Sequence, residues 1–211
     1  MTTTKRWIAV AAVSGSLDSR QSDAVAMAEV DHSSAASRLC SACGMCCNGV
    51  MFHTVRLQPG DSARDLSALG LKLKRKKGGN YILQPCPAFR GSHCSIYAAR
   101  PERCRLFACR QLQRVSAGEI TEAVALERIR EAQRRVAEVT DLLERSGSTS
   151  PKRPLSKRYE KLMAEPLDPS SDSVVAELRS QLTRTMRELD VFLDEEFRLP
   201  PGGTSGAVPE P

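Results

Sequence analysis

The chain has 211 residues, a length that allows one compact domain with appended segments or two small domains. Its net charge is +6, and the excess is uneven, because residues 40–110 carry 12 Lys or Arg and only 3 Asp or Glu. No stretch approaches the roughly 18 apolar residues of a membrane helix, so we expect no membrane association.

The N-terminal segment, residues 1–38, is rich in small and polar residues, and we expect it to be mostly disordered. Lys5 and Arg6 precede a short apolar run, which gives a faint likeness to a secretory signal. That run ends at Val13 and Asp18 follows soon after, so we interpret the protein as cytoplasmic. In a reducing compartment, clustered cysteines indicate metal binding or catalysis, whereas a secreted chain would favour four disulfides.

The next segment, residues 39–113, is the predicted metal-binding domain. It contains all eight cysteines and five of the nine aromatic residues, so it is the part of the chain richest in residues that can form a packed core. A core of this size is usually stabilised by disulfides or by metal. The cysteines therefore decide how this segment is interpreted.

Three short elements are predicted inside this domain. Residues 50–57 have the β-branched and aromatic content of a strand. A stop at Pro59 and Gly60 precedes a short helix predicted over residues 61–69. Residues 72–84 alternate apolar and basic side chains on one side of a glycine-rich turn, which predicts a β-hairpin.

The remaining segment, residues 114–199, differs in character, because apolar residues recur there at helical spacing in two runs. These runs cover residues 119–145 and 175–193, and a connector rich in Pro, Lys and Arg separates them over residues 148–170. We predict an antiparallel helical hairpin whose apolar stripes form a core, with a surface for a protein partner as the alternative. The predicted fold class is α+β, with a disordered tail over residues 200–211.

The strongest motif is Cys40-Ser-Ala-Cys43-Gly-Met-Cys46-Cys47. Cysteines two residues apart can turn both sulfurs toward one ion while nearby amides donate hydrogen bonds to them. Three cysteines at this repeat are typical of ferredoxin-type clusters, which a distant cysteine followed by proline completes, and Cys86 is such a residue. We therefore expect the cofactor to bind Cys40, Cys43, Cys46 and Cys86. Since neighbouring side chains diverge, either Cys46 or Cys47 is expected to serve a second metal, to bridge, or to stay free.

The later cysteines are Cys94, Cys104 and Cys109, and they do not repeat the two-residue spacing. A zinc ribbon would repeat it in its second half, so the pattern favours an iron–sulfur cluster over a zinc ribbon. Eight thiolates also suffice for two tetrahedral Zn²⁺ sites, and spacing leaves that alternative open. The arginines interleaved with these cysteines are expected to lower the cysteine pKa values and stabilise thiolates.

The cysteines fall in four motifs that follow one another in a fixed order: Cys40-x-x-Cys43-Gly-x-Cys46-Cys47, Cys86-Pro87-Ala-Phe, Cys94-Ser-Ile-Tyr97 and Arg100-Pro101-x-x-Cys104-Arg105. This order resembles the CxxCxxCC family of YkgJ-like cysteine-cluster proteins, which are described as zinc- or iron-chelating. The resemblance covers about residues 40–110. It implies metal binding by seven cysteines, namely Cys40, Cys43, Cys46, Cys47, Cys86, Cys94 and Cys104. Cys109 lies just past the last motif, and we include it as an eighth ligand.

The expected function is metal binding through cysteine thiolates. The alternative is a redox or group-transfer enzyme that uses an iron–sulfur centre, although no catalytic residue is identified. His53 and His93 are expected to lie beside the metal site or on the surface rather than to bind metal. The basic run over residues 72–77 is expected to be solvated, so we expect no nucleic-acid partner.

Overall fold

The computed structural model describes residues 34–91, 93–148, 150–166 and 173–200. Within these ranges, helices accompany small antiparallel sheets with short strands, so the predicted α+β class is confirmed. The predicted disordered ends fall largely in residues 1–33 and 201–211, which lie outside the described residues. No helix in the described ranges has the length and apolar character needed to cross a membrane.

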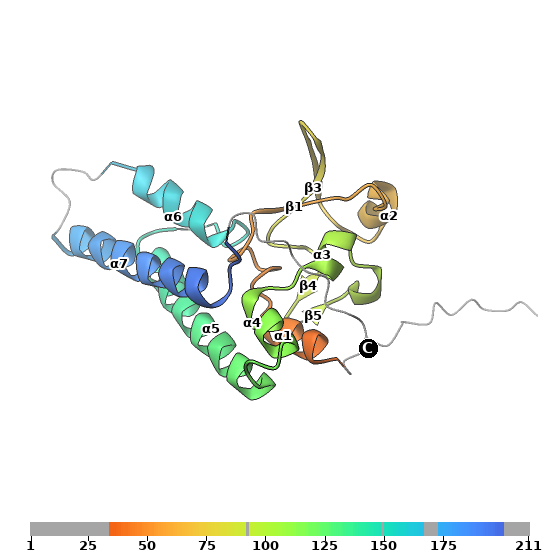
Figure 1. Ribbon diagram of the computed structural model, residues 1–211. Helices are drawn as coiled ribbons and strands as arrows, with labels where there is room; N and C mark the ends of the chain where they lie inside the picture. The colour runs from red at the N-terminus through yellow and green to blue at the C-terminus, as the bar shows by residue number, and fades with distance from the viewer. Residues whose placement is uncertain (1–33, 92, 149, 167–172, 201–211) are drawn as a thin grey trace, which may run out of the picture.

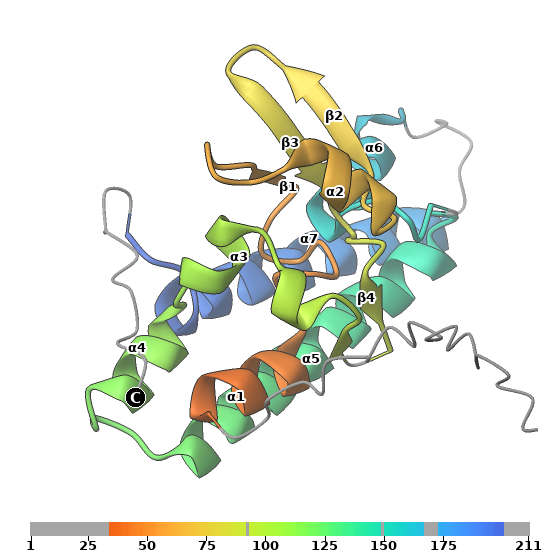
Figure 2. The ribbon, with the colours of Figure 1, turned by 90° about the vertical axis from the view of Figure 1, so that its right-hand side faces the viewer.

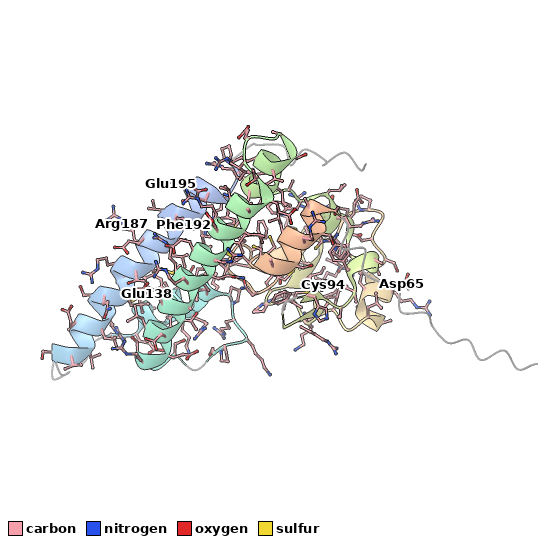
Figure 3. The ribbon with its side chains drawn as sticks, turned by 90° about the horizontal axis from the view of Figure 1, so that it is seen from below. Asp65, Cys94, Glu138, Arg187, Phe192 and Glu195 are labelled. Atoms are coloured by element: carbon pink, nitrogen blue, oxygen red, sulfur yellow. The ribbon has the colours of Figure 1, made fainter. Side chains whose placement is uncertain are left out.

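Three helices form one layer of the molecule: α1 (Ala35–Cys43), α5 (Glu122–Arg145) and α7 (Ser173–Glu196). Figure 3 shows them side by side, with α5 between the other two, and Figure 2 shows α1 lying along α5. The N-terminus of α5 is fixed by Thr121, whose side-chain oxygen accepts a hydrogen bond from the backbone N–H of Val124. The two helices predicted over residues 119–145 and 175–193 are α5 and α7.

One hydrophobic core joins the cysteine-bearing segment to the long helices. Leu39 and Met45 come from the start of the described chain, Ala132 from α5 and Leu189 from α7, and each of them is almost fully buried. Phe197, just past α7, is buried in the same core. Since close packing makes such a core sensitive to every member, the helices and the cysteine-bearing segment support each other.

The predicted β-hairpin is present, and it projects from the rest of the molecule (Figures 1 and 2). It consists of β2 (Leu73–Lys76) and β3 (Gly79–Leu83), and β1 (Thr54–Arg56) pairs with the other edge of β3. β1 is shorter than the strand predicted over residues 50–57. A second, two-stranded sheet pairs β4 (Phe89–Arg90) with β5 (His93–Cys94).

The predicted helix at residues 61–69 is present as α2 (Ala63–Ala68), but Asp61 is not its cap. Ser62 is the N-cap, and its side-chain oxygen accepts from the backbone N–H of Asp65. The carboxylate of Asp61 accepts instead from the backbone N–H groups of Gln58 and Glu102, both at 2.8 Å. Asp61 thereby holds α3 (Glu102–Leu106) beside the loop that precedes α2.

Several helices were absent from the sequence-based prediction. In the described chain, α6 (Leu155–Ala164) lies within the basic connector that was predicted to have no helix. Its buried Leu155 and Leu162 and half-buried Tyr159 follow helical spacing, but the Pro and Lys content of the connector concealed this pattern. The other unpredicted helices are α1, α3, α4 (Arg110–Ser116) and the 3₁₀ turn η1 (Tyr97–Ala99).

Candidate metal centre

The eight cysteines come from several separate elements of the fold. Figure 3 places Cys94 on the side of α1 that faces away from α7. In chain order, the cysteines lie in α1 (Cys40, Cys43), in the turn after it (Cys46, Cys47), after β3 (Cys86), in β5 (Cys94), in α3 (Cys104) and at the N-cap of α4 (Cys109). All eight are half-buried, and none of them forms a disulfide.

Four of these residues are electrostatic neighbours, which we name the first sulfur group: Cys40, Cys43, Cys46 and Cys109. Burial raises the pKa of the Cys40, Cys43 and Cys46 thiols, and negative charge on Cys109 raises the pKa of all three further. Gly44 makes this arrangement possible, because it ends α1 with a φ of 65° and the chain then turns back. The fourth sulfur of this group belongs to Cys109, the N-cap residue of α4.

The other four cysteines form a second sulfur group: Cys47, Cys86, Cys94 and Cys104. Burial raises the pKa of Cys47, and charge on the other three sulfurs raises it further. The backbone N–H of Cys86 donates to the carbonyl oxygen of Cys47 at 2.7 Å, which fixes these two positions together. Cys94 is placed beside Cys86 because it pairs with Phe89 across β4 and β5.

The division between the groups falls between two adjacent residues. The pKa of Cys46 is raised by charge on Cys43, Cys109 and Cys40 and, least, on Cys47, whereas that of Cys47 is raised by charge on Cys86, Cys94 and Cys104 and, least, on Cys40. Sequence spacing predicts that Cys86 completes the set with Cys40, Cys43 and Cys46, and that ligand set stays a prediction. In the structure, charge on Cys109 raises the pKa of all three, so Cys109 is a further candidate for the fourth ligand.

The sulfurs of each group are neighbours, yet they are not drawn together as metal ligands. In the part of the chain that the structure describes, no three Cys, His, Asp or Glu side chains stand close enough to hold one ion. A bound metal would therefore have to draw the sulfurs of a group inward. Such a rearrangement couples metal binding to the folding of the site.

Burial dominates the acid–base chemistry of the cysteines. It raises the pKa of Cys40 and of Cys104 to about 11, and that of Cys43 and of Cys47 to about 12. The thiols are consequently protonated at neutral pH in the absence of metal. A bound cation reverses this preference, because its charge stabilises the thiolates that the apolar surroundings disfavour.

Arg100 is the cation that influences both sulfur groups. Burial raises the pKa of Cys40 and Cys104, and the charge of Arg100 lowers both. The guanidinium is held over the ring of Tyr97, 3.6 Å from the ring centroid, and its Nε donates to the carbonyl oxygen of Tyr97 at 3.1 Å. The predicted effect of the arginines is therefore present here, but it is smaller than the effect of burial, so the net shift is upward.

The raised pKa values predict a definite response of the metal-free protein to alkali. Each thiol is neutral in both states below its ordinary pKa of 9.0, so its stabilising contribution is complete there. As pH rises from about 9 toward about 12, the unfolded chain loses protons first, and the folded state loses up to about 1.4 kcal/mol per pH unit for each buried thiol. Ultraviolet thiolate absorbance, followed together with circular dichroism, measures both effects. Thiols that titrate near 9 while the helices persist would contradict this prediction.

The histidines near the cysteines are exposed. Nε2 of His53 lies 2.6 Å from Oγ of Ser156, at the start of α6, and His93 pairs with Arg90 in the small sheet. His53 therefore connects the segment after the cysteine motif to α6. The metal-binding candidates are the eight thiols.

Comparison with known proteins bears on the same segment. Residues 39–130 match the model of the CxxCxxCC family, described as "Putative zinc- or iron-chelating domain". The resemblance to this family is confirmed for this segment. The match extends past Cys109 into α5, so the CxxCxxCC segment includes both sulfur groups and the first part of the long helix. No curated protein and no solved structure matches the chain.

Proposed function

We propose that this protein binds two metal centres in a reducing cytoplasm, one in each sulfur group. The observation that carries the proposal is that, among eight free cysteines, the sulfurs with the largest influence on Cys46 differ from those with the largest influence on its neighbour Cys47. Four thiolates are a complete ligand set for a tetrahedral zinc ion or for an iron–sulfur cluster. A single centre would leave half of these half-buried thiols without a role.

The residues present suit soft, thiolate-binding metals. All eight candidate donors are sulfur, and the Asp61 carboxylate, whose charge raises the pKa of Cys104, already accepts two backbone hydrogen bonds. Backbone N–H groups of Ala88 and Phe89 face the Cys86 sulfur, where burial raises the pKa and these hydrogen bonds lower it. Amide hydrogen bonds to sulfur are a regular part of cysteine metal sites.

The first sulfur group is proposed to hold an iron–sulfur cluster. It combines three cysteines at two-residue spacing with one distant cysteine, which is the ferredoxin-type pattern with Cys109 in the place expected for Cys86. The second group contains no two-residue repeat, and its proposed occupant is a zinc or iron ion. In both sites the four thiolates close the coordination, which favours a structural or electron-relay role over catalysis.

Metal analysis of protein purified without air tests this proposal. We expect two centres per chain, with iron and acid-labile sulfide present and a brown colour that fades on exposure to air. A colourless protein with two zinc ions would retain the two-site assignment and overturn the iron–sulfur assignment. A protein that contains a single metal ion, or none after expression in metal-supplemented medium, would overturn the division into two sites.

A further inference from the structure

A small basic cavity lies outside the CxxCxxCC segment, where the loop after α5 meets α6 (Figure 1). Its volume is about 30 Å³, which is room for about two water-sized groups. Arg153, Arg158 and Lys161 line it together with the Ser148 and Ser150 side chains, and Glu165 is the one acidic residue in the lining. Cationic and hydroxyl groups therefore surround most of a space that has the scale of a small anion.

Arg158 is the residue that makes this cavity a candidate site for an anion. Its side chain is only 6% exposed, and within the described chain its Nη2 has no hydrogen-bond partner. Nε makes one long contact, 3.5 Å to Oγ of Ser148. A guanidinium carries five N–H donors, and burying the two on Nη2 without a partner is costly, which indicates that a hydrogen-bond acceptor is missing from this place.

Glu144 does not supply the missing hydrogen-bond acceptor for Nη2 of Arg158. Its carboxylate lies 3.6 Å from Nη2 of Arg158, beyond hydrogen-bond distance, and its own side chain is 60% exposed. An exposed carboxylate at that distance is screened by water and contributes little. The two Nη2 donors of Arg158 are thus available to a ligand in the cavity.

We propose that this cavity is a binding site for a phosphoryl group. Arg158 would meet two of its oxygens with a planar pair of donors, and Arg153 and Lys161 would reach in from the exposed rim. Ser148 and Ser150 supply hydroxyl donors of the kind that phosphate oxygens accept. The ligand is either free inorganic phosphate or the phosphate group of a larger molecule.

The site is connected to the cysteine motif by short contacts at the start of α6. The backbone N–H of Leu155 donates to the carbonyl oxygen of Gly49 at 3.3 Å, and Ser156 contacts His53. Asn48 and Gly49 directly follow Cys47 in the chain. The cavity nevertheless shares no residue with either sulfur group, so its ligand can be tested independently of metal content.

Isothermal calorimetry with the full chain tests the proposal, with inorganic phosphate in one arm and O-phosphoserine in the other, at constant ionic strength. We expect saturable binding of inorganic phosphate, and binding of O-phosphoserine as well if the natural ligand is larger. Lys161→Gln and Arg153→Gln should each weaken binding about tenfold, because each removes a charge-assisted contact. Arg158→Gln should abolish it.

Lys157→Gln is the matched control, since Lys157 lies on α6 one turn before Lys161, carries the same charge, and does not line the cavity. It should leave phosphate affinity unchanged. Because Arg158 is buried, the exposed Arg153 and Lys161 variants keep the test valid if Arg158→Gln fails to fold. Absence of saturable binding in the unaltered protein, or equal weakening by Lys157→Gln, would overturn the proposal. Metal content should be the same in all of these variants, whatever the proposed centres contain.

Discussion

Replacing Cys46 by serine is expected to remove one metal centre from the protein, and replacing Cys47 by serine is expected to remove the other. The two residues are adjacent, yet the largest sulfur influences on Cys46 come from the first sulfur group and those on Cys47 come from the second. Serine has nearly the shape of cysteine but is a far weaker ligand for soft metals. Each variant should therefore retain one of the two metal centres.

The element that is lost identifies the site. If the first group holds the iron–sulfur cluster, Cys46→Ser should lose iron and sulfide together with the visible absorbance, while Cys47→Ser should retain them. Elemental analysis and absorbance of protein purified without air measure this. The same spectrum in both variants, or complete loss of metal from both, would show that the eight cysteines serve one shared centre.

Two further variants extend this comparison to residues that are distant in the chain. Cys109→Ser should reproduce the metal content of Cys46→Ser, and Cys86→Ser should reproduce that of Cys47→Ser. The sequence pattern alone predicts the opposite pairing for Cys86. These variants thus separate the grouping observed in the fold from the grouping expected from spacing.

The contrast between these pairings shows what local sequence can determine. The hairpin of β2 and β3 was predictable, because alternation of apolar and basic residues and a glycine turn act within a few residues. The helix α5 was predictable for the same reason, since its apolar stripe repeats over six turns. The helix α6 was missed because its stripe is short and lies in a segment rich in Pro and Lys.

The grouping of the cysteines depends on long-range packing instead. Cys109 is the N-cap of α4, which contacts α5, and it packs against the same hydrophobic core as Cys40 and Cys43 of α1. Hydrogen bonds between Gln111 and Glu196 further connect α4 to the end of α7. Nothing in the residue spacing around Cys109 indicates these contacts. Sequence motifs therefore place Cys109 outside the family pattern, whereas the fold brings it near Cys40, Cys43 and Cys46.

Gly44→Ala is expected to destabilise the protein by about 2–4 kcal/mol, well beyond the ordinary effect of a glycine substitution. Gly44 has a φ of 65°, which disfavours any residue with a Cβ atom. A Cβ at this position would also lie 2.3 Å from Cζ of Phe89, so the ring would have to move. Phe89 pairs with Cys94, and its displacement would disturb the second sulfur group as well.

Gly70→Ala separates the two causes. Gly70 also has a positive φ, 87°, but a Cβ there would meet no atom within 4 Å, so only the backbone cost of about 1 kcal/mol is expected. Urea unfolding of the metal-bound protein measures both variants. Adding Phe89→Leu to Gly44→Ala should relieve the clash and recover part of the lost stability, which a double-mutant cycle detects as favourable coupling. Equal destabilisation by Gly44→Ala and Gly70→Ala, with no coupling to Phe89, would contradict the close approach of the cysteine turn to the Phe89 ring.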